Sequence, residues 1–203
     1  METIIVENRY VTPSKIICVG RNYVQHIEEL GNEIPDDMVV FLKPNSAISE
    51  ELHSFHQEDL HFEGELSFLF ENDGFSAVGF GLDITKRKLQ SKLKSKGLPW
   101  ERAKAFDGSA LFSPFVEISN ISQNLSFDLD INGKNIQVGN VDLMIYKPED
   151  ILAEILTFMS LSDGDIVMTG TPAGVGPINP GQVFAGRVKD NDVIVTSAEW
   201  LSK

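Results

Sequence analysis

Short hydrophobic segments separated by polar turns dominate the chain, and this pattern is typical of a β-rich domain. Strands are expected at residues 3–6, 15–19, 39–43, 61–70, 75–82, 115–118, 125–131, 135–138, 166–168, 183–188 and 193–200. Many of these segments alternate or are rich in Val, Ile and Phe, as strands are. Asn132-Gly133 is the strongest hairpin signal in the chain.

Helical patterns are fewer and shorter. A short helix is expected over 23–30, with Gly31 as its stop, and a basic helix over 85–96. The clearest amphipathic helix spans 149–161, after Pro148. Its expected buried stripe is Ile151, Leu152, Ile155, Leu156 and Met159. With no repeat and no evident linker, residues 1–203 are predicted to form one α+β, β-rich domain.

The segment 61–70 carries the most informative pattern. Strand side chains point alternately to opposite faces, so Glu63, Glu65 and Ser67 share one face. Two neighbouring carboxylates repel each other unless a positive charge lies between them, and Mg²⁺ or Mn²⁺ would supply it. The alternative is a strand with one solvated face. Asp83, at the end of the next strand, is either a helix cap or a third metal ligand.

Composition narrows the possible partners. The chain has 203 residues, a net charge of −13 and one cysteine. The negative charge argues against nucleic acid and anionic membranes, and it makes an anionic substrate awkward unless local bases reverse the potential. Cys18, in an apolar run, is expected to be a buried strand residue. Without a signal peptide or a membrane-spanning apolar run, a cytoplasmic protein is expected.

Two further patterns have candidate chemistry. His53, His56 and His61 could bind zinc, although their spacing fits no standard zinc pattern and no cysteine accompanies them. The Gly-rich loop 169–176 can expose backbone N–H groups to an anion, but it does not match a nucleotide P-loop. His26 and Glu29 are neighbours on one face of the expected helix, a spacing that is also common on solvated helices.

Taken together and in order, the motifs resemble the fumarylacetoacetate hydrolase family from Lys15 to the C-terminus. The resemblance rests on 19–23 followed by His26 and Glu29, then 41–44, 62–66, Asp83, Thr85, Arg87, Gln90, 97–100, 103–107, 132–133, Gln137 and 164–174. It is closest to the acylpyruvase and oxaloacetate decarboxylase branch. The segment between Glu65 and Asp83 is shorter than usual, and Lys88 stands where an acid is usual.

The resemblance implies a mixed β-roll with a few short helices, a homodimer, and Mg²⁺ or Mn²⁺ held by Glu63, Glu65 and Asp83. It implies that His26 and Glu29 form a catalytic pair on a lid, with Lys104 also catalytic. Substrate-binding residues would be Arg21, Gln90 and the Gly170-Thr171 backbone, which would hold the keto-acid carboxylate.

Three kinds of reaction fit these residues. The first choice is metal-dependent hydrolysis of a C–C bond in an acylpyruvate-like 2,4-dioxo acid, with Glu29 and His26 activating water. The alternatives are oxaloacetate decarboxylation and isomerisation or tautomerisation of a 2-hydroxyhepta-2,4-diene-1,7-dioate type. A non-catalytic binding protein is disfavoured, because a mere binder needs no water-activating pair.

Overall fold

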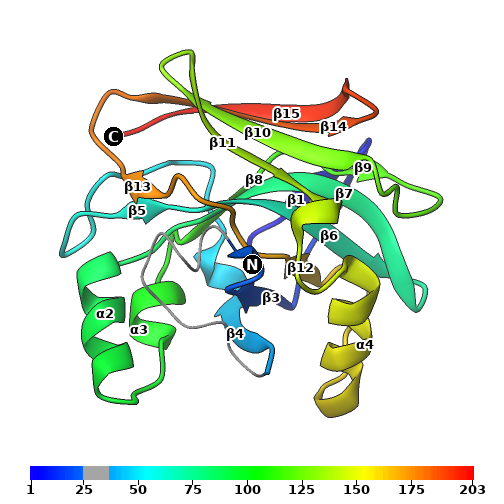
Figure 1. Cartoon of the computed structure of the whole chain (residues 1–203), viewed down its shortest axis with the longest axis horizontal. Helices are drawn as coiled ribbons and strands as arrows, with labels where there is room; N and C mark the ends of the chain where they lie inside the picture. Colours follow the sequence, from blue (N-terminus) through cyan, green and yellow to red (C-terminus); the bar gives the residue numbers. More distant parts are fainter. Residues whose placement is uncertain (25–36) are drawn as a thin grey trace.

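In the computed structural model, which describes residues 1–24 and 37–203, two β-sheets face each other (Figure 1). The larger sheet has the strand order β4-β3-β12-β6-β7-β8, and β9 pairs with β7. Its strands are β3 (Lys15–Gly20), β4 (Val39–Pro44), β6 (Gly64–Glu71), β7 (Gly74–Asp83), β8 (Ala110–Phe112), β9 (Val116–Glu117) and β12 (Ile166–Met168).

The smaller sheet lies over one face of the larger one and has the order β11-β10-β14-β15. Its strands are β10 (Leu125–Ile131), β11 (Lys134–Asn140), β14 (Val183–Asp190) and β15 (Val193–Leu201). The short pairs β1 (Ile4–Val6) with β2 (Arg9–Val11), and β5 (His61–Phe62) with β13 (Gly176–Pro177), complete the strands of the described residues.

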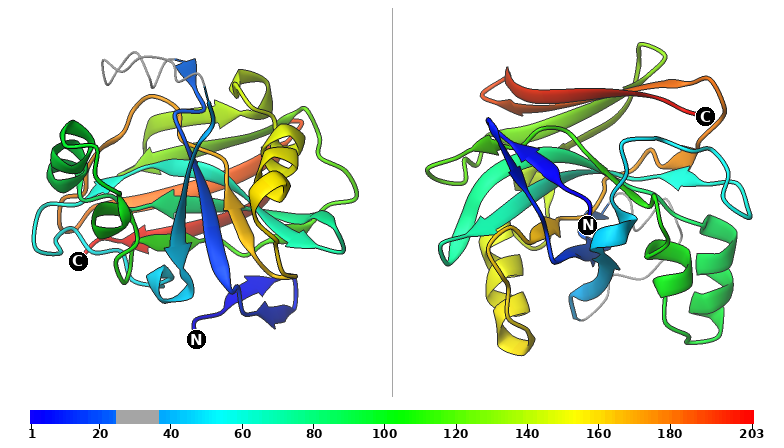
Figure 2. Two further views of the ribbon diagram at one scale, coloured as in Figure 1. Left: turned by 90° about the horizontal axis from the view of Figure 1, so that it is seen from below. Right: turned by 180° about the vertical axis from the view of Figure 1, so that it is seen from behind.

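The helices lie below the larger sheet. As Figures 1 and 2 show, α2 (Arg87–Ser95) and α3 (Glu101–Lys104) lie together at one side and α4 (Pro148–Phe158) at the other. Short 3₁₀ turns span Asn45–Ala47 and Val141–Leu143. The predicted β-rich α+β class is confirmed. No helix among the described residues is long and apolar enough to cross a membrane.

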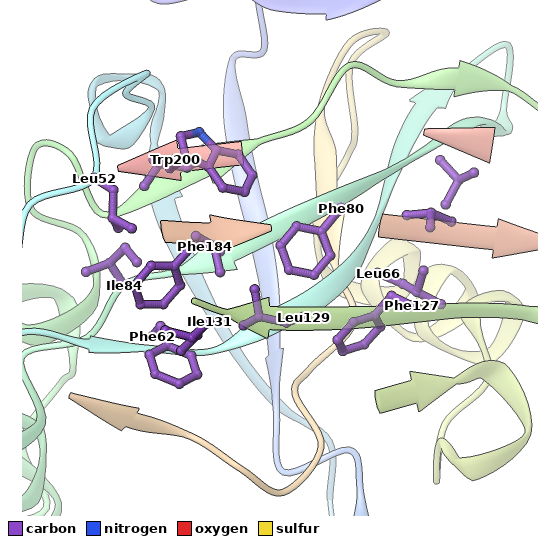
Figure 3. Close-up of a cluster of buried hydrophobic side chains, with 14 of the residues drawn as sticks. Leu52, Phe62, Leu66, Phe80, Ile84, Phe127, Leu129, Ile131, Phe184 and Trp200 are labelled. Atoms are coloured by element: carbon purple, nitrogen blue, oxygen red, sulfur yellow. The ribbon is translucent and has the colours of Figure 1, made fainter. Parts of the chain in front are cut away.

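A hydrophobic core fills the space between the two sheets (Figure 3). The Phe80 ring on β7 lies 5.5 Å from Phe127 on β10 and 6.1 Å from Trp200 on β15. A side chain at Gly186 on β14 would meet the Phe80 ring at 2.2 Å, so a glycine is required for this packing. The smaller sheet therefore rests on the strand that ends at Asp83.

Beside the smaller sheet, the same face of the larger sheet packs against α4 at β3 and β12, since Val167 pairs with Phe68 of the inter-sheet core. Ile17 and Val167, on the parallel pair β3 and β12, contact Ile151 and Ile155. The stripe predicted for α4 is confirmed only in part, because Leu156 is 48% exposed. The opposite face carries Cys18 and is covered by Ile4 and Val6 of β1 and by Phe115, so Cys18 is buried on β3 as predicted.

Most predicted strands are confirmed within one or two residues, including the hairpin, where Asn132 and Gly133 have positive φ angles of 52° and 75°. The predicted strand 61–70 is in fact divided into β5 and β6 at Glu63. The prediction missed β2, β8, β13 and α3. Most of the expected helix 23–30 lies outside the described residues.

Candidate metal and anion site

The antiparallel pairing of β6 with β7 brings Asp83 beside the two glutamates. Gly64 pairs with Leu82 and Glu65 with Gly81, and the Asp83 N–H donates to the Glu63 carbonyl at 2.8 Å. Glu63, Glu65 and Asp83 are 6%, 2% and 0% exposed. Their candidate ligand atoms all lie within 4.8 Å of one another. The sequence prediction that these carboxylates gather at one place is therefore confirmed.

The two alternatives for these residues are wrong. The glutamate face is not solvated, because the larger sheet is covered on both sides and even Ser67 is fully buried. Asp83 does not cap a helix, since α2 begins at Arg87 after Lys86. Its carboxylate points into the cluster instead.

Buried cations surround the carboxylates. Lys104 Nζ donates to Glu63 Oε2 at 2.8 Å and to Asp83 Oδ2 at 2.6 Å. Lys43 Nζ lies 2.8 Å from Asp83 Oδ1, and Arg87 pairs with Glu63 Oε1. These three cations match the three carboxylates one for one when Glu65 is ionised. A bound divalent ion would therefore leave the cluster net positive.

Glu65 has the least favourable surroundings of the three. Its Oε2 accepts a hydrogen bond from the Gly170 N–H at 2.7 Å. Burial raises the pKa of Glu65 well above its ordinary value, and the charges of Asp83 and Glu63 raise it further. Burial alone would lower the pKa of Lys104, but Asp83 and Glu63 raise it above its usual range. Lys104 is therefore held as an ammonium ion, suited to stabilising negative charge rather than to removing a proton.

The donor set fits a hard divalent cation. Carboxylate oxygens are the ligands that Mg²⁺ and Mn²⁺ prefer. Asp83 Oδ1, although close to Lys43, makes no hydrogen bond of acceptable geometry within the described chain. A cation beside it would also relieve the repulsion on Glu65. The described residues hold no other such group of metal-ligating side chains, so the zinc alternative for the histidines is not supported.

One face of α2 contributes positive charge. Arg87, Gln90 and Lys94 are spaced three and four residues apart, so they lie on the same side of the helix. Arg87 donates to Gln90 Oε1 at 2.8 Å and so fixes the orientation of that predicted substrate-binding amide. Burial lowers the pKa of Lys94, and the charges of Arg21 and Arg87 lower it further. These neighbouring cations make the local potential positive, so an anionic substrate can be attracted to this place although the whole protein carries a net charge of −13.

The loop after β12 lies against the cluster. Gly170 has φ +97°, and a side chain there would lie 2.9 Å from Asn22 Cβ. Its N–H is bound to Glu65, and the Thr169 N–H donates to the Leu66 carbonyl at 3.1 Å. Two of the loop's backbone N–H groups, which were expected to be free to hold a substrate carboxylate, are therefore already bound within the chain. At Thr171, which is buried, the backbone N–H and the hydroxyl are the candidate donors for that role.

Of the other predicted site residues, the structure describes Arg21 but not His26 and Glu29. Arg21 is half-buried with φ +58° and has a buried Nε with no hydrogen-bond partner within the described chain. His26 and Glu29 lie outside the described residues, so their predicted catalytic pairing stays a prediction. Sequence reasoning assigned no role to Lys43 or Gln137. The signal for Lys43 was a lysine inside an otherwise apolar strand.

Comparison with known proteins agrees with this geometry. Residues 15–202 match the family model described as "Fumarylacetoacetate (FAA) hydrolase C-terminal". The chain is 38% identical to the oxaloacetate tautomerase YcgM of Escherichia coli, over 83% of this chain and 85% of the relative. It is 37% identical to a mitochondrial oxaloacetate decarboxylase of Dictyostelium discoideum, over 85% and 88%.

A solved structure extends the likeness to the fold. The fumarylpyruvate hydrolase of Pseudomonas aeruginosa, in complex with Mn²⁺ and pyruvate, superposes with a TM-score of 0.87 at 26% identity. The alignment covers 100% of this chain and 96% of that one.

Proposed function

This chain belongs to the fumarylacetoacetate hydrolase family, a family of enzymes, and from that premise we propose that it interconverts the enol and keto forms of oxaloacetate or a very similar 2-oxo dicarboxylic acid. The observation that carries this choice is the 38% identity, over 83% of the chain, to a relative named as an oxaloacetate tautomerase. The cations around the carboxylate cluster suit a substrate with two negative charges.

Hydrolysis of an acylpyruvate, the first choice from sequence, has weaker support. The fumarylpyruvate hydrolase of Pseudomonas aeruginosa is 26% identical to this chain, whereas the two relatives named for oxaloacetate chemistry are 37–38% identical. Oxaloacetate decarboxylation is the second candidate, because the relative from Dictyostelium discoideum carries that name. Both oxaloacetate reactions pass through an enolate of the 2-oxo acid, so one arrangement of residues serves either.

The proposed cofactor is Mg²⁺ or Mn²⁺ held by Glu63, Glu65 and Asp83. Such a cation would act as a Lewis acid on the 2-oxo group and lower the energy of the enolate. The Mn²⁺ in the structure of the Pseudomonas aeruginosa protein supports this choice of ion.

The other side chains of the site would stabilise charge on the substrate and bind it. Lys104, kept protonated by its two carboxylate partners, compensates negative charge that develops on the substrate. Gln90, oriented by Arg87, and Lys94 on the next turn of α2 bind and orient the anion. Thr171 holds the carboxylate next to the 2-oxo group.

Tautomerisation also needs a proton to leave the enol oxygen and another to reach the neighbouring carbon. The predicted pair His26 and Glu29 is suited to carry out both transfers. No attacking water is required, in contrast to hydrolysis.

One panel of assays separates the three reactions. Purified protein with Mg²⁺ is given oxaloacetate or an acylpyruvate, and enol absorbance, pyruvate release and C–C cleavage are followed against blanks without protein. We expect loss of enol absorbance to be accelerated far more than pyruvate release or acylpyruvate cleavage. Fast acylpyruvate cleavage, with enol loss no faster than in the blank, would overturn the proposal in favour of the hydrolase.

Dimer formation and location stay predictions. The homodimer rests on the resemblance and can be checked by light scattering at micromolar concentration. Some relatives are named as mitochondrial proteins and the one from Escherichia coli is not, so the cytoplasmic location expected from sequence is open to fractionation experiments.

A further inference from the structure

A single buried amide links the smaller sheet to the candidate site. Gln137, on β11, is 1% exposed. Its Oε1 accepts a hydrogen bond from the Gly64 N–H at 2.9 Å. Its Nε2 donates to Thr171 Oγ1 at 2.9 Å and to the Pro172 carbonyl at 3.1 Å, with the Ala173 carbonyl at 3.5 Å.

Both ends of this amide lie at functional positions. Gly64 stands between Glu63 and Glu65, and a side chain at Gly64 would meet Gln137 Oε1 at 2.9 Å. At the other end, Thr171 follows Gly170, whose N–H holds Glu65. One side chain therefore spans from the segment with two metal-ligand candidates to the loop that lies against the carboxylate cluster.

The orientation of the amide is determined by its surroundings. If its oxygen and nitrogen exchanged places, the amino group would face the Gly64 N–H, and two donors would oppose each other. The Gly64 N–H thus forces the amino group toward Thr171. Since that group can only donate, the Thr171 oxygen must accept.

An oxygen that accepts from Gln137 keeps its own proton for another partner. The Pro172 carbonyl is a poor partner for it, being 3.5 Å from Thr171 Oγ1 and already bound to Gln137 at 3.1 Å. The hydroxyl proton is therefore available to an anion in the site.

We propose that Gln137 is a positioning residue that sets the direction of the Thr171 hydroxyl, so that this hydroxyl donates to the carboxylate next to the 2-oxo group of the substrate. The proposal rests on the proposed function only in taking a 2-oxo acid as the ligand. Gln137 itself does not touch the substrate, and it acts through Thr171.

The direct test is Gln137→Glu. This carboxylate has the same shape and still accepts from the Gly64 N–H, but at Thr171 it accepts instead of donating. The hydroxyl would turn toward it and away from the ligand. Calorimetry with oxalate, in saturating Mg²⁺, should show affinity about ten- to a hundredfold weaker, the worth of one hydrogen bond to a charged group. The KM for oxaloacetate should rise more than kcat falls, and Mg²⁺ affinity should stay within about threefold.

A double-mutant cycle separates positioning from charge repulsion. In the Thr171→Val background, which has no hydroxyl, Gln137→Glu should change oxalate affinity by less than about twofold. Thr171→Ser keeps the hydroxyl and should preserve the full effect. Equal penalties in the native and Thr171→Val backgrounds would overturn the proposal, as would a loss of Mg²⁺ affinity as large as the loss of oxalate affinity.

Two further variants serve as a substitute and as a charge control. Gln137→Met removes the donors without adding charge, and it takes the place of Gln137→Glu in the same cycle if the latter fails to fold. Gln123→Glu puts the same charge on an exposed loop residue and should leave oxalate affinity unchanged. Oxalate binding needs no turnover. If native protein binds oxalate and the cycle behaves as expected while oxaloacetate is not converted, the proposed function fails and the role of Gln137 stands.

Discussion

Two charge-removing substitutions within the carboxylate cluster should have opposite effects on the metal-free protein. Asp83→Asn leaves the ammonium group of Lys43, 2.8 Å from Asp83, without this buried carboxylate, and leaves Lys104, 2.6 Å from Asp83, with Glu63 as its remaining carboxylate partner. Breaking a buried ion pair in this way costs about 3–5 kcal/mol. For a domain of this size, that is a fall in Tm of roughly 6–20 °C.

Glu65→Gln should not lower the Tm of the metal-free protein. A glutamine oxygen can still accept from the Gly170 N–H at 2.7 Å. It also removes a charge that burial, Asp83 and Glu63 make unfavourable, as the raised pKa of Glu65 indicates. Both variants nevertheless remove a proposed ligand, so both should lose the stabilisation that metal gives.

Thermal unfolding with and without metal measures both effects. A cation at a hundred times its Kd stabilises the folded state by about 2.7 kcal/mol, or roughly 5–11 °C here. Native protein should show this shift with Mn²⁺, and Glu65→Gln should lose most of it. Glu199→Gln, which removes the same charge from an exposed position on β15, is the matched control and should keep it. A full Mn²⁺ shift in Glu65→Gln would refute the assignment of the metal to this cluster.

Three further predictions concern other parts of the chain. Lys94→Met should raise the KM for oxaloacetate about five- to tenfold with little change in kcat, while Lys92→Met, on the exposed side of α2, should not; equal effects would refute an anion-binding role. Glu29→Gln should lower any acylpyruvate hydrolysis by about 10² to 10⁴ and oxaloacetate decarboxylation less; a change in hydrolysis within about twofold would exclude Glu29 as the base. Burial alone would raise the pKa of Asp165, but hydrogen bonds from Lys15 and Ser14 lower it below the ordinary value. The stability that Asp165 contributes is therefore present above pH ~4 and is lost as the pH falls further. In urea unfolding, Asp165→Asn should be about 3 kcal/mol less stable than the native protein at pH 7, and this difference in unfolding free energy should become smaller in acid.

The sequence was most informative where a local pattern decides the outcome. The period of two predicted that Glu63 and Glu65 lie together, as they do although the strand is interrupted at Glu63. Asn132-Gly133 predicted a hairpin whose residues have the positive φ angles that such turns need. Asp83 joined the cluster because the turn between β6 and β7 determines their register. The order of motifs in the chain then indicated the family.

The sequence was less informative where distant segments decide burial. Whether the glutamate face is solvated depends on the covering of the larger sheet, which no local pattern encodes. The buried Lys43 contacts Asp83, which is distant in sequence, and Gln137 reaches Gly64 across 73 positions. Leu156 fits the helical stripe of α4 yet is 48% exposed, because the sheet below covers only the residues nearest to it.

The most direct test of the account is a metal titration of oxaloacetate tautomerisation. Protein stripped of metal is supplied with increasing Mn²⁺, and the loss of enol absorbance is followed against a blank with Mn²⁺ and no protein. The account predicts no acceleration without metal and a saturable rise in rate with Mn²⁺, which Glu65→Gln shifts to higher concentrations. Full activity in the stripped protein, or none at saturating Mn²⁺, would contradict it.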